Sequence, residues 1–216
     1  MSGRLVLASR SPQRRAILEQ LGVAFTVVVS DAEELTAGDD PVSVAVANAA
    51  LKAQAVWRAG PVVSNPPTRA HTGLAAGARA SSSPLARSAS VVLGVDTVVV
   101  LDGAIYGKPD GCAEARATLS RLSGRVHEVV SGLAVVEAGE TRTASATTRV
   151  SFRDVDPATL DWYLATEEWR ERAGGYAIQG RGAALVAAIE GDYLNVVGLP
   201  VTALLELLPG ILHADS

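Results

Sequence analysis

Short apolar runs alternate with amphipathic segments along the 216 residues of the chain. Runs rich in β-branched residues predict strands at 4–8, 25–29, 91–101, 126–136, 141–152 and 183–189. Apolar residues at helical spacing predict helices at 12–21, 42–57, 110–123 and 201–208, and Asp156-Pro157 begins a further helix. Asp102-Gly103 and Gly139 mark hairpin turns. This mixture of hairpins and strand–helix units predicts an α/β fold with a mixed sheet.

One segment departs from this pattern. Residues 60–90 contain four Pro, six Ser, seven Ala and three Gly, together with three Arg and no acidic residue. No apolar periodicity survives there, so we predict a flexible surface insertion within a single domain that spans 1–216. A basic lid over a substrate is the alternative interpretation.

Composition narrows the class of protein. The formal net charge is −4, which argues against general affinity for nucleic acid, because such affinity needs clustered basic charge. Cys112 is the single cysteine, so an intramolecular disulfide is excluded and a reducing cytoplasm is favoured. No apolar run approaches the ~20 residues of a membrane span. The composition therefore predicts a cytoplasmic protein that binds neither nucleic acid nor membranes.

The first candidate site lies between the first strand and the first helix. Ser9, Ser11 and Arg14 lie here, with two further arginines and with Pro12 at the first helical position. Hydroxyls, guanidiniums and the free N–H groups of a helix N-terminus together bind phosphate well. Basic residues in a first helical turn oppose the helix dipole, and a bound anion would compensate for them. A capped helix with solvated arginines is the alternative.

A second candidate is the acidic run Asp31-Ala32-Glu33-Glu34, which follows a strand. Clustered carboxylates suit a hard cation such as Mg²⁺. A solvated acidic turn is the alternative. The three histidines of the chain show no zinc-site spacing, which argues against zinc.

Physical chemistry favours a functional role for Asp96 more strongly than for any other residue of the chain. It interrupts the apolar run VLGVDTVVV, and a buried carboxylate is costly unless it is paired or metal-bound. The alternative is a turn aspartate before a strand that begins at Thr97. Lys108 lies twelve residues further on, across the predicted hairpin, and we expect its ammonium to return beside Asp96.

A glycine-rich segment, AGGYAIQG, carries Gln179. It matches neither the phosphate-binding loop of nucleoside triphosphatases nor the glycine-rich dinucleotide-binding motif. A Gln flanked by glycine suits hydrogen bonding to the edge of a base, and an ordinary loop is the alternative. Aromatic residues make up only 4% of the chain, so stacking platforms for single-stranded nucleic acid are not indicated.

Ordered blocks of the sequence resemble the Maf family of nucleoside triphosphate pyrophosphatases, which are also described as septum-formation inhibitors. The blocks include LVLASRSPQRRAILEQLGVAF, SDAEE, NAALKAQAV, LGVDTVVVLDGAIYGKPDG and AGGYAIQGRGAALV, and together they cover nearly the whole chain except 60–90. The resemblance implies an elongated mixed sheet flanked by helical lobes around a central cleft, as in inosine-triphosphate-pyrophosphatase-like enzymes. It also implies hydrolysis between the α- and β-phosphates, a divalent cation (Mg²⁺ or Mn²⁺) and a homodimer.

The resemblance also assigns roles to individual residues. Asp96 matches the proton acceptor, and Thr97 and Gln179 match positions that select the base. Substrate-binding and metal positions fall on Ser9, Arg14, Lys52, Lys108 and Glu33. The combination of Asp96-Thr97 with the segment Ala177-Ile178-Gln179-Gly180 resembles the pattern of the family branch that acts on dTTP and UTP. Gln13 stands where the family has an arginine linked to specificity, which weakens the pyrimidine assignment but not the reaction class.

A mechanism follows from these roles. Arg14, Lys52 and Lys108 are expected to neutralise the triphosphate, helped by Ser9 and Ser11. Glu33 and Asp96 are expected to hold the cation, and Asp96 to orient or deprotonate the attacking water. The alternatives are a pyrophosphatase for 7-methyl-GTP or another modified nucleotide, a non-catalytic nucleotide-binding regulator of cell division, and a nucleic-acid-binding protein.

Overall fold

The computed structural model describes residues 4–36, 38, 40–60 and 90–213. Within these residues a seven-stranded sheet has the order β2-β1-β3-β5-β6-β7, with β4 paired to β3. The strands are β1 (Arg4–Ala8), β2 (Phe25–Val27), β3 (Ser90–Leu101), β4 (Ala104–Tyr106), β5 (Val126–Glu137), β6 (Glu140–Phe152) and β7 (Val186–Glu190). β1 is parallel to β2 and β3, whereas the other neighbours are antiparallel. The predicted α/β fold with a mixed sheet is confirmed.

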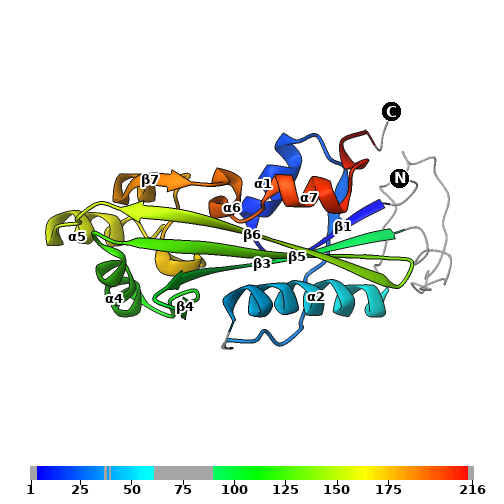
Figure 1. Cartoon of the computed structure of the whole chain (residues 1–216), viewed down its shortest axis with the longest axis horizontal. Helices are drawn as coiled ribbons and strands as arrows, with labels where there is room; N and C mark the ends of the chain where they lie inside the picture. Colours follow the sequence, from blue (N-terminus) through cyan, green and yellow to red (C-terminus); the bar gives the residue numbers. More distant parts are fainter. Residues whose placement is uncertain (1–3, 37, 39, 61–89, 214–216) are drawn as a thin grey trace, which may run out of the picture.

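The helices cover both faces of this sheet. They are α1 (Pro12–Gln20), α2 (Pro41–Ala59), α4 (Cys112–Leu122), α5 (Pro157–Ala165), α6 (Tyr193–Val197) and α7 (Val201–Leu207), with 3-10 helices η1 (Ala173–Gly175), η2 (Arg181–Leu185) and η3 (Ile211–His213). Figure 1 shows that β3, β5 and β6 run along the long axis of the molecule. At one end α2 lies on one face and α1 and α7 on the other, while α4 and α5 lie at the opposite end. The expected elongated sheet with flanking helices is therefore observed.

Local chemistry fixes most element boundaries where the sequence indicates them. The side chain of Ser11 caps α1 and that of Asp156 caps α5, each followed by proline at the first helical position. The helix expected from residue 110 begins two residues later, because Gly111 has an extended backbone and is its N-cap residue. The strand expected at 183–189 begins at Val186, because the preceding residues form η2.

The predicted insertion at 60–90 lies outside the described residues except for its two ends. Gly60 ends α2 with a φ of 76°, and Ser90 begins β3. Among the described residues, no helix is both long enough and apolar enough to cross a membrane.

Two glycines let α2 lie directly against the centre of the sheet. A Cβ atom at Gly94 of β3 would collide with the backbone of Ala49, and one at Gly132 of β5 would collide with the backbone of Ala45. Gly132 is also the cross-strand partner of Asp96. Because these two glycines have no side chain, the backbone of α2 packs close to β3 and β5 at the level of Asp96. This close packing places the polar residues of α2 next to the Asp96 carboxylate.

Candidate active site

A cavity lies beside a stretch of β3 that has no strand partner on one edge within the described residues. β1 pairs with β3 as far as Gly94, and β4 pairs with the same edge from Val99 onward. Within the described part of the chain, residues 95–98 are therefore unpaired along this edge. A cavity of about 750 Å³ opens here, and Asp96, Thr97 and Val99 contribute to its wall. This volume is in the usual range for small-molecule sites.

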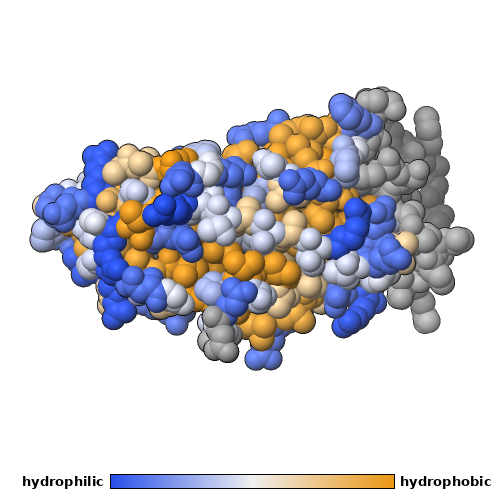
Figure 2. Space-filling view, viewed as in Figure 1, coloured by the Kyte–Doolittle hydropathy of each residue, from blue (hydrophilic) through white to orange (hydrophobic). Residues whose placement is uncertain are grey.

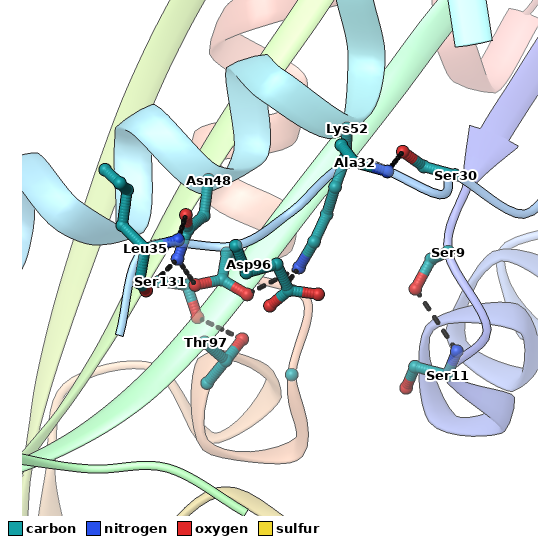
Figure 3. Close-up of polar contacts among 12 residues, drawn as sticks. Ser9, Ser11, Ser30, Ala32, Leu35, Asn48, Lys52, Asp96, Thr97 and Ser131 are labelled. Carbon is teal, nitrogen blue, oxygen red and sulfur yellow. Dashed lines mark hydrogen bonds and ion pairs between the residues drawn. The ribbon is translucent and has the colours of Figure 1, made fainter. Parts of the chain in front are cut away.

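Asp96 is held by two side chains of α2. Adjacent residues of a strand point to opposite faces, and Asp96 lies on the face that α2 covers. Its Oδ1 accepts a hydrogen bond from Lys52 Nζ at 2.6 Å, and its Oδ2 accepts one from Asn48 Nδ2 at 3.1 Å. Asn48 and Lys52 are four residues apart, so they share one face of the helix, as Figure 3 shows. Asn48 is fixed in turn by two hydrogen bonds with the backbone of Leu35.

The charges around Asp96 keep it ionised. The side chains of Asp96 and Lys52 are 8% and 11% exposed, and the Lys52 ammonium also lies 3.0 Å from Oε2 of Glu34. Burial alone raises the pKa of Asp96, but Lys52, the charge of Arg14 and the Asn48 hydrogen bond outweigh it and hold the pKa below its usual value. At neutral pH the cavity therefore contains a fixed, buried carboxylate.

Arg14 reaches the same cavity from α1, on the other face of β3. Its guanidinium donates to Thr97 Oγ1 at 3.0 Å, to Ser9 Oγ at 3.1 Å and to the Gly198 carbonyl at 2.8 Å. Thr97 Oγ1 also lies 2.9 Å from Ser131 Oγ on β5. Arg14 forms no ion pair within the described residues, and its burial lowers its pKa. A partly buried cation with no carboxylate at ion-pair distance among the described residues favours an anionic ligand.

The beginning of α1 completes this side of the cavity. Ser11 Oγ accepts from the Arg14 N–H at 3.5 Å, and the Ser11 N–H donates to Ser9 Oγ at 3.2 Å. Ser9, Ser11, Gln13 and Arg14 all line the cavity. The hydroxyls, the guanidinium and the helix N-terminus expected at the strand–helix junction therefore lie side by side.

Lys108 and Gln179 line the cavity from the segments around β4 and η1. The Lys108 ammonium does not lie beside Asp96 as expected; it pairs with Glu171 at 2.8 Å. The cause is tertiary, because the Gly174 N–H donates to the Gly107 carbonyl at 2.9 Å and ties the segment after β4 to η1. Lys108 therefore lines the cavity with its ammonium paired to Glu171.

Comparison with known proteins agrees with the geometry. The family model described as Maf-like protein matches residues 4–211. The chain belongs to the Maf family. A dTTP/UTP pyrophosphatase of Moorella thermoacetica is 43% identical over 207 residues, which cover 95% of this chain and 93% of the relative. Proteins of the same name are 42% identical over 209 residues in Gloeobacter violaceus and 35% over 208 in Pyrococcus furiosus, with 94% to 96% of each sequence covered.

The Maf chain gathers nearly all of the predicted site residues around one cavity. Those that line it are Ser9, Ser11, Gln13, Arg14, Lys52, Asp96, Thr97, Lys108 and Gln179. Glu33 is exposed and does not line it, whereas the next residue, Glu34, does. Asp31 also lines the cavity. Residues 31–36 form neither helix nor strand, so no regular periodicity indicated which carboxylates of the acidic run reach it.

The residues present fit a divalent cation that binds together with a phosphate group. Asp96 and Glu34 offer oxygen ligands only, as Mg²⁺ and Mn²⁺ prefer. Among the described residues no group of three or more His, Cys, Asp or Glu side chains forms a complete metal site. Mg²⁺ commonly takes one or two carboxylates and completes its shell with waters and substrate phosphates. Asp96 and Glu34, which share the Lys52 ammonium, match that pattern in a cavity that is also lined by Asp31, Glu171 and several cationic side chains.

Three further residues of this Maf site were not predicted. Asn48 is identifiable from the sequence, because it lies four positions before Lys52 on an alanine-rich helix and therefore shares a helix face with it. Ser131 likewise interrupts an apolar strand. Arg172 lines the cavity, but it stands in a charged stretch, so nothing in the sequence distinguishes it from a solvated arginine.

Proposed function

We propose that this Maf protein hydrolyses dTTP and UTP between the α- and β-phosphates, releasing the monophosphate and pyrophosphate, and so removes nucleotides from the cellular pool. The observation that carries the proposal is the buried, ionised Asp96 in a cavity whose wall also holds the N-terminus of α1 and Arg14, which forms no ion pair among the described residues. The relatives named dTTP/UTP pyrophosphatase support the same reaction.

The cationic groups of the cavity account for binding of the triphosphate. Lys52 supplies a buried positive charge and Arg14 a partly buried one, and Lys108 adds a more exposed one, with its side chain 60% accessible. Ser9 and Ser11 add hydroxyl groups beside the helix N-terminus. Phosphoryl transfer depends mainly on positioning and on stabilisation of charge, so no protein nucleophile is needed.

Asp96 orients the attacking water and accepts its proton. Its low pKa in the free protein makes it a weak base, and the Lys52 ammonium contributes to that low value. When the ammonium turns toward a phosphate, the pKa of Asp96 rises and the carboxylate becomes a better proton acceptor. The bond between the α-phosphorus and the bridging oxygen then breaks, and pyrophosphate leaves with the electron pair.

A divalent cation, Mg²⁺ or Mn²⁺, completes this proposal. Asp96 and Glu34 would hold it, with Glu34 in place of the Glu33 that we expected from the sequence. When bound, the cation neutralises negative charge on the phosphate oxygens. The paired carboxylates and the triphosphate-sized cavity support this role.

We also propose that the protein is a cytoplasmic homodimer and binds neither nucleic acid nor membranes. Large apolar side chains remain exposed, including Leu51 on α2 at 39%, Trp162 on α5 at 48% and Tyr193 on α6 at 42%. Figure 2 shows hydrophobic residues gathered along the middle of one face, with hydrophilic residues toward both ends. Exposed apolar surface of this kind supports contact with a second copy of the chain.

The experiment that tests the proposal is a panel of nucleoside triphosphates assayed for pyrophosphate release. We expect kcat/KM for dTTP and UTP to exceed that for CTP and GTP by about 5- to 150-fold, because mismatched buried hydrogen-bonding groups cost this much. Gln179→Ala should narrow the difference, since one amide can pair with both the carbonyl and the ring N–H of uracil.

Gln54→Ala is the matched control, because Gln54 bonds to Thr141 on the exposed surface and does not line the cavity. It should leave the ranking unchanged. If 7-methyl-GTP is the best substrate, or if Gln179→Ala leaves the ranking intact, the pyrimidine assignment is wrong.

A further inference from the structure

Gln13 is tied to a residue from a distant part of the chain. Its Oε1 accepts a hydrogen bond from Arg172 Nη1 at 3.0 Å, and Ser11 Oγ lies 3.1 Å from the same oxygen. Gln13 lies in the first turn of α1, and Arg172 immediately precedes η1. Both residues line the cavity, so the contact joins two of its walls.

The direction of these hydrogen bonds fixes the orientation of the Gln13 amide. A guanidinium can only donate, so the amide atom that faces Arg172 must be the oxygen. Ser11 Oγ accepts from the backbone N–H of Arg14 and therefore has its own proton to donate to the same oxygen. A flipped amide would place its NH₂ group against Arg172, donor against donor. The NH₂ group of Gln13 must therefore point away from Arg172.

The surroundings leave Arg172 available for this contact. The carboxylate beside it, Glu171, is paired with Lys108 at 2.8 Å, and Arg172 forms no ion pair in the part of the chain that the structure describes. Its Nε is buried and has no hydrogen-bond partner among those residues. Gln13 Nε2 has no protein partner there either. The donor side of the Gln13 amide is thus left for a ligand in the cavity.

We propose that Arg172 is a positioning residue that makes Gln13 a fixed hydrogen-bond donor to a carbonyl oxygen of the pyrimidine base. This inference rests on the proposed function. A neutral amide donor matches a neutral carbonyl, whereas Arg14 and Lys52 already supply charge for phosphates. Uracil and thymine carry a carbonyl where cytosine carries an amino group, so a donor that cannot flip rejects cytosine. Freed from Arg172, the amide can turn and accept from that amino group.

The test is the ratio of kcat/KM for UTP to kcat/KM for CTP. Arg172→Met should lower this ratio about fivefold, the equivalent of one neutral hydrogen bond. Loss of the positive charge also lowers kcat/KM for both substrates alike, so the ratio is the quantity that reports on Gln13. Arg172→Lys should keep most of the ratio, because an ammonium also donates to Oε1. Arg170→Met is the control, since Arg170 bonds to Glu167 and does not line the cavity.

A double-mutant cycle shows whether Arg172 acts through Gln13. Gln13→Met should lower the ratio by itself, and adding Arg172→Met to it should produce no further fall. If Arg172→Met leaves the ratio unchanged, or lowers it equally in the Gln13→Met background, the positioning role is wrong. A wild-type protein that releases no pyrophosphate from UTP would instead overturn the proposed function, so the two failures are distinguishable.

Discussion

Replacing Asp96 by Asn should lower kcat for pyrophosphate release from dTTP and UTP by about 10²- to 10⁴-fold, the usual contribution of a general base. The substitution keeps the size of the side chain and its place on β3, but it removes the charge that orients water and accepts its proton. KM should change much less, because Arg14 and the N-terminus of α1 remain in place.

The Asp96→Asn variant should stay folded but become less stable. The introduced amide can offer its oxygen to Lys52, but its NH₂ group then faces Nδ2 of Asn48, which cannot flip because both ends of its amide bond the backbone of Leu35. One unsatisfied contact of this kind costs about 1–3 kcal/mol. Circular dichroism and urea unfolding measure this loss separately from the loss of activity.

Asp102→Asn is the matched control. Asp102 follows β3 directly, pairs with Arg125 on the surface and has a φ of 52°, which asparagine tolerates. This variant should keep wild-type activity. A folded Asp96→Asn variant that releases pyrophosphate at nearly the wild-type rate would contradict the role of Asp96.

Lys52→Met should have the largest effect on stability, about 3–5 kcal/mol in the free energy of unfolding at pH 7. Removing one partner of a buried ion pair leaves the other charge buried and uncompensated. Here Asp96 and, in part, Glu34 lose the same ammonium. Urea unfolding measures the loss, and the double variant Lys52→Met/Asp96→Asn should recover part of it, since it buries no unpaired carboxylate.

The same variant should also change the pH dependence of activity. The Lys52 contact holds the pKa of Asp96 down in the free protein, so its removal raises that pKa and moves the acid limb of the kcat/KM profile to higher pH. Lys108→Met is the stability control, because its ion pair with Glu171 is exposed and contributes less than ~1 kcal/mol. If Lys52→Met is as stable as the wild-type protein and has the same acid limb, the proposed pairing of Lys52 with Asp96 is wrong.

The sequence predicted the elements and the principal residue of the site for simple reasons. Apolar periodicity identifies buried strands, Ser11-Pro12 and Asp156-Pro157 mark helix starts, and a lone carboxylate in an apolar strand indicates a function for Asp96. The alternation of side chains also explains why Asp96 and Thr97, adjacent in sequence, meet different helices.

Other features depend on contacts between distant segments. Within the described residues, the edge of β3 at 95–98 is unpaired because β1 ends at Ala8, opposite Gly94, and β4 begins pairing at Val99. The hydrogen bond between Gly107 and Gly174 decides where Lys108 lies, and the loop before α2 decides that Glu34 rather than Glu33 turns inward. No local pattern in the sequence encodes these outcomes, so Arg172 and the partner of Lys108 came only from the structure.

The identity of the products tests most directly whether this Maf site hydrolyses the bond between the α- and β-phosphates. Phosphorus NMR of UTP incubated with the protein and Mg²⁺, beside a parallel sample of Asp96→Asn, distinguishes the two possible cleavages. We predict UMP and pyrophosphate in equal amounts from the wild-type protein, and unchanged UTP from the variant over the same time. The appearance of UDP and inorganic phosphate, or of UMP and pyrophosphate at equal rates in both samples, would contradict the proposed reaction at Asp96.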